Sequence, residues 1–226
     1  MSADAVEIVE PLVRRLLAPN PSAFTYTGTQ SFIVGRGEVA VIDPGPDLPG
    51  HVDALVAALA GEQVVAIVCT HTHRDHSPAS RALAATTGAP IVGCAPLAMA
   101  DDGPRADDAF DFAYEPDRVL RDGERLSGPG WTLTAVATPG HTSNHLCFAL
   151  EKTGALFSGD HVMGWSTTIV SPPDGDMADY MTSLERLLGR DDRVYYPAHG
   201  PAVEKPPKWV RGLLGHRRQR EGQILR

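Results

Sequence analysis

The sequence has 226 residues and a formal net charge of −8 at pH 7, with 42% hydrophobic and 21% charged residues. These values are typical of an ordinary globular protein, long enough for one large domain or a domain with an appendage. No run of about 18 apolar residues occurs, so we expect no transmembrane helix and no membrane partner. The acidic N-terminus lacks the layout of a secretory signal, so we expect a cytoplasmic protein.

Charge is distributed unevenly along the chain. Residues 205–226 hold seven basic residues and one acid, a net charge of +6, which leaves −14 on residues 1–204. An acidic stretch at 101–117 has seven acids and one arginine but little apolar periodicity, so we expect an exposed loop with short helical pieces there. The body should repel polyanions, whereas the basic tail could attract RNA.

The three cysteines are Cys69, Cys94 and Cys147, and none is part of a Cys-x-x-Cys motif. They follow or lie within apolar segments, which favours buried free thiols in a reducing compartment. Cys69 directly precedes a cluster of potential metal ligands. Its position at the end of an apolar segment nevertheless favours a role in the core over ligation.

The first half of the chain predicts alternating strands and helices. Residues 31–34 and 38–43 form a hairpin across Gly35 and Gly37, which are not a GxGxxG fingerprint because no helix follows them. The next elements are a helix at 51–59, a strand at 63–69, a helix ending near Thr87 and a strand at 91–94. We expect Ser77 to cap the second of these helices, with Pro78 at its first position.

The second half predicts mainly strands, followed by two helices. Strands are expected at 118–120, 131–136, 145–150, 155–157 and 193–196, with a hairpin between 145–150 and 155–157. An amphipathic helix at 179–188 has one apolar face made of Tyr180, Met181, Leu184, Leu187 and Leu188. A basic helix is expected from about Pro207 onward.

Four side chains of the metal-ligand type fall within six residues, at His71, His73, Asp75 and His76. They lie on the loop between the strand at 63–69 and the following helix, where side chains can converge on one point. Neutral imidazole and ionised carboxylate are natural ligands of zinc and similar divalent metals. The spacing excludes the helical metalloprotease motif, which needs two histidines four residues apart with a glutamate between them. The sequence therefore predicts a metal site here.

Three further potential ligands, His141, Asp160 and His199, each follow a short apolar strand. Binding sites gather where rigid strands end and loops begin, so we expect these side chains to meet the 71–76 cluster. A glycine beside each of them permits the tight turn that this convergence requires.

Several neighbouring residues predict supporting roles. We expect His145 to support the site rather than ligate, and His161 to lie in the core or a loop. The segment 163–169 is expected to form either a pocket wall or a packed surface loop. Ser158 lacks the leading glycine of a GxSxG nucleophile elbow, so it is not expected to be a nucleophile.

The motifs His-x-His-x-Asp-His at 71–76, Pro-Gly-His141, Gly-Asp160 and His199-Gly occur in this order, and together they resemble those of the metallo-β-lactamase-fold hydrolase superfamily. Periodicity alone predicts a mixed α and β domain. The resemblance implies an α+β fold, an αββα sandwich with the metal site at the edge of two β-sheets. It also implies two Zn²⁺ ions, with Fe or Mn as alternatives. The implied ligands are His71, His73 and His141 for the first metal, Asp75, His76 and His199 for the second, and Asp160 as the bridge.

A closer resemblance is to the β-lactamase-like protein 2 branch, through residues 70–77, Gly159-Asp160, residues 179–181 and the motif that begins at His216. In that branch the last motif leads into a small winged-helix-like domain. We therefore expect a hydrolase domain at 1–203 and, at 204–226, a basic helix that resembles the start of such a domain.

The resemblance implies a hydrolase in which paired metals lower the pKa of water and supply hydroxide at neutral pH. Asp75 is the expected catalytic residue, orienting the nucleophile while it ligates. The acidic body favours a small acyl substrate, such as an ester, lactone, thioester or β-lactam. The alternative is a single-strand endoribonuclease, favoured by the branch resemblance and the basic tail. A redox enzyme of the diiron reductase type is disfavoured by histidine at position 73.

Overall fold

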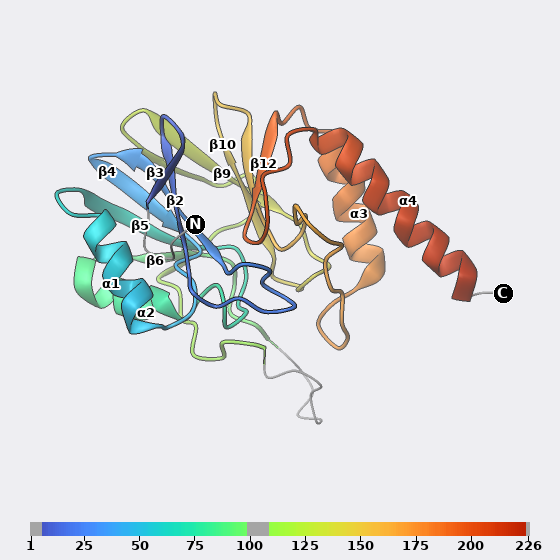
Figure 1. The fold of residues 1–226 in the computed structure, drawn as a ribbon, viewed down its shortest axis with the longest axis horizontal. Coiled ribbons are helices and arrows are strands. Elements are labelled where there is room, and N and C mark those ends of the chain that lie inside the picture. The colour runs from blue at the N-terminus through green and yellow to red at the C-terminus, as the bar shows by residue number, and fades with distance from the viewer. Residues whose placement is uncertain (1–5, 99–108, 225–226) are drawn as a thin grey trace.

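Two β-sheets pack face to face in the computed structural model, which describes residues 6–98 and 109–224 (Figure 1). The first sheet has seven strands in the order β1-β2-β3-β4-β5-β6-β7, and the second has five in the order β12-β11-β10-β9-β8. Helices α1 and α2 lie on the outer side of the first sheet, and α3 and α4 on the outer side of the second. The predicted αββα sandwich is confirmed.

The strands of the first sheet are β1 (Glu7–Glu10), β2 (Val13–Leu17), β3 (Gln30–Arg36), β4 (Glu38–Ile42), β5 (Gln63–Cys69), β6 (Ile91–Gly93) and β7 (Arg118–Val119). Those of the second are β8 (Arg125–Gly128), β9 (Trp131–Ala137), β10 (Leu146–Leu150), β11 (Ala155–Gly159) and β12 (Val194–Pro197). The helices are α1 (Pro49–Ala58), α2 (Ala79–Thr87), α3 (Met177–Leu188) and α4 (Pro206–Ile224). Both expected hairpins, β3–β4 and β10–β11, pair antiparallel as predicted.

The core consists of three apolar layers, and β10 shows how the sequence divides between them. Its alternate residues Leu146, Phe148 and Leu150 face the layer between the sheets, while Cys147 and Ala149 face α3 and α4. All five are buried because helices cover the far side of the sheet. Helix α3 contributes Tyr180, Leu184 and Leu187 to the outer layer, on the face that its amphipathic pattern predicts.

Parallel pairing decides where the loops gather. Strand β5 pairs parallel with β4 and β6, and β11 pairs parallel with β12. The carboxyl ends of parallel neighbours lie at the same edge of a sheet. As a result, the residues that follow β4, β5, β11 and β12 come together at one edge of the sandwich.

One local expectation is wrong, and a second holds only in part. Ser77 does not cap α2: its hydroxyl donates to the Asp111 carboxylate at 2.8 Å, and no side chain caps the helix. The acidic stretch 101–117 is expected to be an exposed loop with short helical pieces. Its described part is a loop, in which Phe112, Ala113, Glu115 and Asp117 are exposed. Residues 101–108 lie outside the described residues, but Phe110, Asp111 and Tyr114 are buried and non-helical. Phe110 packs on the His73 ring at 4.7 Å, a contact that no local pattern can indicate.

Helix α4 packs on α3 through Val210, Leu213 and Leu214, which share the outer apolar layer. The domain boundary expected at residue 204 stays a prediction. Within the described residues, no helix combines the length and the apolar character needed to cross a membrane.

Candidate metal centre

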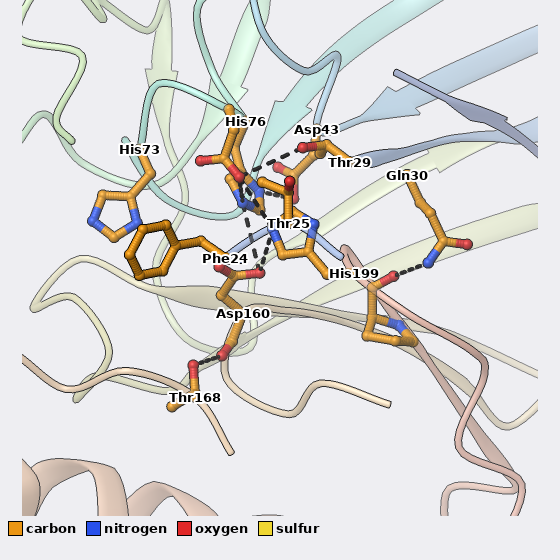
Figure 2. A network of polar contacts seen from close by, with 12 residues as sticks. Phe24, Thr25, Thr29, Gln30, Asp43, His73, His76, Asp160, Thr168 and His199 are labelled. Carbon is orange, nitrogen blue, oxygen red and sulfur yellow. Dashed lines mark hydrogen bonds and ion pairs between the residues drawn. The ribbon is translucent and has the colours of Figure 1, made fainter. Parts of the chain in front are cut away.

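Every predicted ligand lies at the edge where the parallel strands end. The loop after β5 carries His71, His73, Asp75 and His76, while Asp160 directly follows β11 and His199 follows β12. His141 lies on the loop between β9 and β10. The structure brings all seven side chains into two adjoining groups of donor atoms, with Asp160 assigned to the first. Figure 2 shows four of them, His73, His76, Asp160 and His199.

The first group consists of His71, His73, His141 and Asp160, whose donor atoms all lie within 4.8 Å of one another. His73 Nδ1 is 3.0 Å from His71 Nε2 and 3.1 Å from His141 Nε2. Asp160 Oδ2 is 3.6 Å from His141 Nε2. Three ring nitrogens and one carboxylate oxygen therefore surround a common point.

The second group consists of Asp75, His76 and His199. His199 Nε2 is 3.1 Å from Asp75 Oδ2, and His76 Nε2 is 3.4 Å from the same oxygen. Asp160 Oδ1 lies 3.3 Å from His199 Nε2 and 3.6 Å from His76 Nε2. The two oxygens of Asp160 thus face different groups, which is the arrangement that a bridging carboxylate requires.

In three of the five imidazoles, hydrogen bonds fix which ring nitrogen carries the proton. The His76 Nδ1 nitrogen is 3.0 Å from the Asp43 carboxylate, and those of His141 and His199 are 2.6 and 3.2 Å from backbone carbonyl oxygens. A carboxylate or carbonyl oxygen only accepts, so each of these Nδ1 atoms donates. The Nε2 lone pairs then point into the cluster, as in histidines that ligate a metal.

Two atoms in the cluster lack a hydrogen-bond partner among the described residues, although both are buried. They are His76 Nε2 and Asp160 Oδ1. Leaving buried polar atoms unpaired is costly, and converging lone pairs repel. A divalent cation at each group would pair the buried atoms and remove the repulsion between the lone pairs, so the donors present fit metal ions.

The pKa shifts in the cluster without metal also indicate a site for metal ions. Burial would raise the pKa of Asp160, but His199 and His76 hold it well below its usual range. Burial lowers the pKa of His199, yet Asp160 and Asp75 raise it to about 10. Burial and the neighbouring His141 lower the pKa of His73 to about 3. The carboxylates Asp75 and Asp160 therefore draw positive charge to the cluster, while His73 stays neutral and keeps a lone pair for a metal.

Asp43 is a supporting residue that the sequence pattern did not reveal as functional. Its carboxylate accepts hydrogen bonds from the Thr70 amide and hydroxyl, both at 2.8 Å, as well as from His76. Thr70 Oγ1 in turn lies 3.0 Å from His71 Nδ1. One carboxylate thereby orients a histidine of each group. A sequence feature that could have indicated this role is the position of Asp43 at the end of β4, the strand that pairs with β5.

Asp160 and His141 are positioned by their own neighbours. The Asp160 amide donates to His145 Nε2 at 3.2 Å, and Thr138 Oγ1 lies 2.9 Å from the other ring nitrogen. The expected supporting role of His145 therefore matches its contacts. Beside His141, the backbone of Gly140 packs against α3, where an added Cβ would come within 2.3 Å of Tyr180 Cα.

The structure also places the remaining residues for which the sequence predicts a role, His161, Ser158 and the three cysteines. His161 is buried, with its ring packed on Tyr180 at 4.9 Å. Ser158 is buried and its hydroxyl donates to the Val162 carbonyl, so it is not available as a nucleophile. The three cysteines are buried free thiols, as predicted.

A pocket of about 510 Å³ opens over the cluster. Its floor includes His73, Asp75, His141, Asp160 and His199. Its walls come from two segments, with Ser22, Phe24 and Thr25 on one and Met163, Thr168, Ile169 and Ser171 on the other, together with Arg74 and Ala109. Figure 2 shows Phe24 beside the cluster. Part of the 163–169 segment therefore forms a pocket wall, one of the two roles that the sequence left open.

The two packed sheets and the His and Asp cluster at their edge match a known protein family. Residues 25–199 match the model of the metallo-beta-lactamase superfamily. The chain is 33% identical, over 97% of its length and 66% of the relative's, to the atrochrysone carboxyl ACP thioesterase of Aspergillus fumigatus. It is 31% identical to the beta-lactamase-like protein 2 homolog of Caenorhabditis elegans, over 99% of this chain and 73% of that protein.

Solved protein structures also superpose well on this chain. A metallo-beta-lactamase family protein of Thermus thermophilus superposes with a TM-score of 0.77 and 25% identity, over 96% of this chain and 83% of that one. TTHA1623 in a di-iron-bound form gives 0.64 and 25%, over 84% and 96%. This chain belongs to the metallo-beta-lactamase superfamily. It spans slightly less than two thirds of the length of the lactamase-like protein notP of Aspergillus sp. (65%) and of the Aspergillus fumigatus thioesterase (66%).

Proposed function

We propose that this protein hydrolyses small acyl substrates (an ester, lactone, thioester or β-lactam) with two divalent metals held by the seven clustered side chains. The observation that carries the proposal is Asp160, whose two carboxylate oxygens face the two donor groups separately. His71, His73 and His141 would hold the first metal, Asp75, His76 and His199 the second, and Asp160 would bridge them.

Histidine-rich donor sets suit zinc and also iron. Zinc is the metal we propose, and the di-iron form of TTHA1623 makes iron the alternative to test. When bound, such metals supply a hydroxide nucleophile at neutral pH and polarise a carbonyl group. The protein's own task is to position the donors and to shape the pocket.

Asp75 is the proposed catalytic residue. Its side chain is 27% exposed, whereas His76 and His199 beside it are almost fully buried. Asp75 also lines the pocket, so its carboxylate can reach a water molecule or a substrate there. His76 and His199 hold its pKa well below the ordinary value, against the effect of burial, so it stays ionised and can orient the nucleophile by accepting a hydrogen bond from it.

The pocket walls favour an acyl group over a polyanion. Phe24 and Ile169 are large apolar side chains that remain 67% and 49% exposed at the pocket. The polar wall residues Ser22, Thr25 and Ser171 are uncharged, and Arg74 is the single arginine or lysine among the lining residues. Exposed apolar side chains around a polar floor are typical of small-molecule sites. The thioesterase name of the Aspergillus fumigatus relative supports the same substrate class.

A single-strand endoribonuclease is the second candidate, favoured by the basic residues of α4 and by the beta-lactamase-like protein 2 relative. Two of those basic residues are already engaged within the protein, because Arg217 bonds the Thr168 carbonyl and Arg218 pairs with Glu185 at 2.6 Å. An RNA enzyme would lose activity steeply as salt rises, which an uncharged acyl substrate would not show.

The test is to determine bound metal and then assay the loaded protein on a thioester, a lactone, a β-lactam and single-stranded RNA. We expect about two metals per chain and acyl hydrolysis, both lost or strongly reduced in His71→Ala and Asp75→Ala. His216→Ala is the matched control, because His216 is exposed on α4. Activity retained in His71→Ala would contradict the proposal.

We further propose a cytoplasmic location, where the three buried thiols stay reduced.

A further inference from the structure

The segment 163–170, here called the wall loop, contacts both the metal cluster and the pocket. Its residues Met163, Thr168 and Ile169 line the pocket. The Thr168 hydroxyl donates to the Asp160 carbonyl, and the Ile169 carbonyl accepts from His141 Nδ1 at 2.6 Å. The position of the loop therefore determines the orientation of the His141 ring and the shape of one pocket wall. Figure 2 shows Thr168 of this loop beside Asp160.

Little within the wall loop holds it in place. It contains no helix or strand, and residues 164–167 are only half-buried. Trp165 stacks on Tyr26, which directly follows the wall residue Thr25, with ring centroids 5.0 Å apart. A loop of this kind depends on neighbouring elements for its conformation.

Helix α4 supplies that support at two points. Its Trp209 indole N–H donates to the Met163 carbonyl at 3.0 Å, and its Arg217 guanidinium donates to the Thr168 carbonyl. These two residues are eight positions apart, about 12 Å along the helix, so they hold both ends of the loop. Arg217 also lies over the Tyr180 ring at 5.5 Å, which fixes its side chain against α3.

We propose that Trp209 and Arg217 are positioning residues through which α4 fixes the wall loop. On this proposal the C-terminal helix sets both the His141 side of the metal cluster and the width of the apolar wall at Ile169. The effect on the metal cluster follows from the hydrogen bonds alone. The effect on acyl selectivity rests on the proposed function.

The experiment uses Trp209→Phe, which removes the indole donor but keeps an aromatic ring, and Arg217→Ala. Arg218→Ala is the matched control, because Arg218 is exposed and pairs only with Glu185 among the contacts described. Circular dichroism first verifies that each variant is folded. Amide hydrogen exchange of residues 163–170 then gives the direct measurement.

We expect exchange in the wall loop to accelerate by about tenfold in both variants and to be unchanged in Arg218→Ala. One of the two Zn²⁺ ions should bind about tenfold more weakly, because His141 loses its fixed carbonyl partner, while the other keeps its affinity. KM for apolar acyl esters should rise more than kcat falls. Unchanged exchange and unchanged Zn²⁺ affinity would overturn the proposal. Failure of the unaltered protein to cleave any acyl substrate would count against the proposed function instead, since neither exchange nor Zn²⁺ affinity depends on activity.

Discussion

The Nδ1 nitrogen of His76 lies 3.0 Å from Asp43 Oδ2, although the two residues are 33 positions apart in the chain. Asp43 also has a φ of 46°, in the left-handed region that non-glycine residues rarely adopt. Such a conformation persists only where the surroundings hold it. Here the three hydrogen bonds to Thr70 and His76 do so, which makes Asp43 the residue that aligns the second donor group.

Replacing Asp43 with asparagine should therefore weaken metal binding. An amide has one oxygen to accept where the carboxylate has two, so one of the three donors loses its partner. We expect Zn²⁺ affinity to fall by about 10–100-fold, measured by competition with a chromophoric chelator. Asp47→Asn, an exposed change four residues away, should leave the affinity unchanged. Equal affinities in the two variants would show that Asp43 does not orient the ligands.

The sequence predicted the parts of the site that depend on local order. His71, His73, Asp75 and His76 are close in the chain and follow an apolar strand, so residue type and spacing sufficed. His141, Asp160 and His199 were placed by the strands that precede them. The positions of all seven in space match that prediction.

The sequence could not reveal contacts that depend on the packing of distant segments. Asp43 meets Thr70 because β4 and β5 pair in parallel, 27 residues apart. The carbonyl groups of Ile169 and Gly28 carry no signal of residue type, yet they orient His141 and His199. Ser77 had the residue type of a helix cap, but Asp111, distant in sequence, takes its hydroxyl group.

Gly140→Ala should destabilise the protein and disturb His141. Gly140 has a φ of 137°, and an added Cβ would lie 2.3 Å from the Cα atom of Tyr180 on α3. Backbone strain and overpacking together should lower the free energy of unfolding by about 2–5 kcal/mol, measured by urea denaturation. Gly123→Ala is the control, since it has a φ of 78° but open space around it, and should cost about 1 kcal/mol. Equal costs would show that the contact with α3 is unimportant.

The buried thiols should make stability fall at alkaline pH. Burial raises the pKa of the Cys147 thiol to about 12, whereas in the unfolded chain it titrates near 8.5. Above about pH 8.5 the unfolded state loses this proton and the folded state keeps it, so the free energy of unfolding decreases as pH rises.

The measurement compares unfolding free energies at pH 7.5 and 9.5 in the unaltered protein and in Cys147→Ala. One thiol contributes at most about 1.4 kcal/mol per pH unit, so the variant should show a decrease smaller by about 1 kcal/mol.

In the native protein at pH 8, a thiol reagent such as DTNB should react with no cysteine among Cys69, Cys94 and Cys147 until denaturant is added. Rapid labelling of the native protein would contradict the buried assignment.

Trp131 links the two sheets through a hydrogen bond, and loss of that bond should lower the free energy of unfolding. It begins β9 in the second sheet, and its indole N–H donates at 2.9 Å to the carbonyl of Glu38, which begins β4 in the first. Gly35 and Gly128 leave space for the ring, since a Cβ on either would lie within 2.6 Å of it. Trp131→Phe leaves the Glu38 carbonyl without this donor, so unfolding should become easier by about 1–3 kcal/mol in urea titrations. Trp165→Phe is the matched control, because the Trp165 indole N–H has no hydrogen-bond partner among the described residues and nothing comparable is lost. If both variants unfold alike, the bond between the sheets contributes nothing measurable to stability.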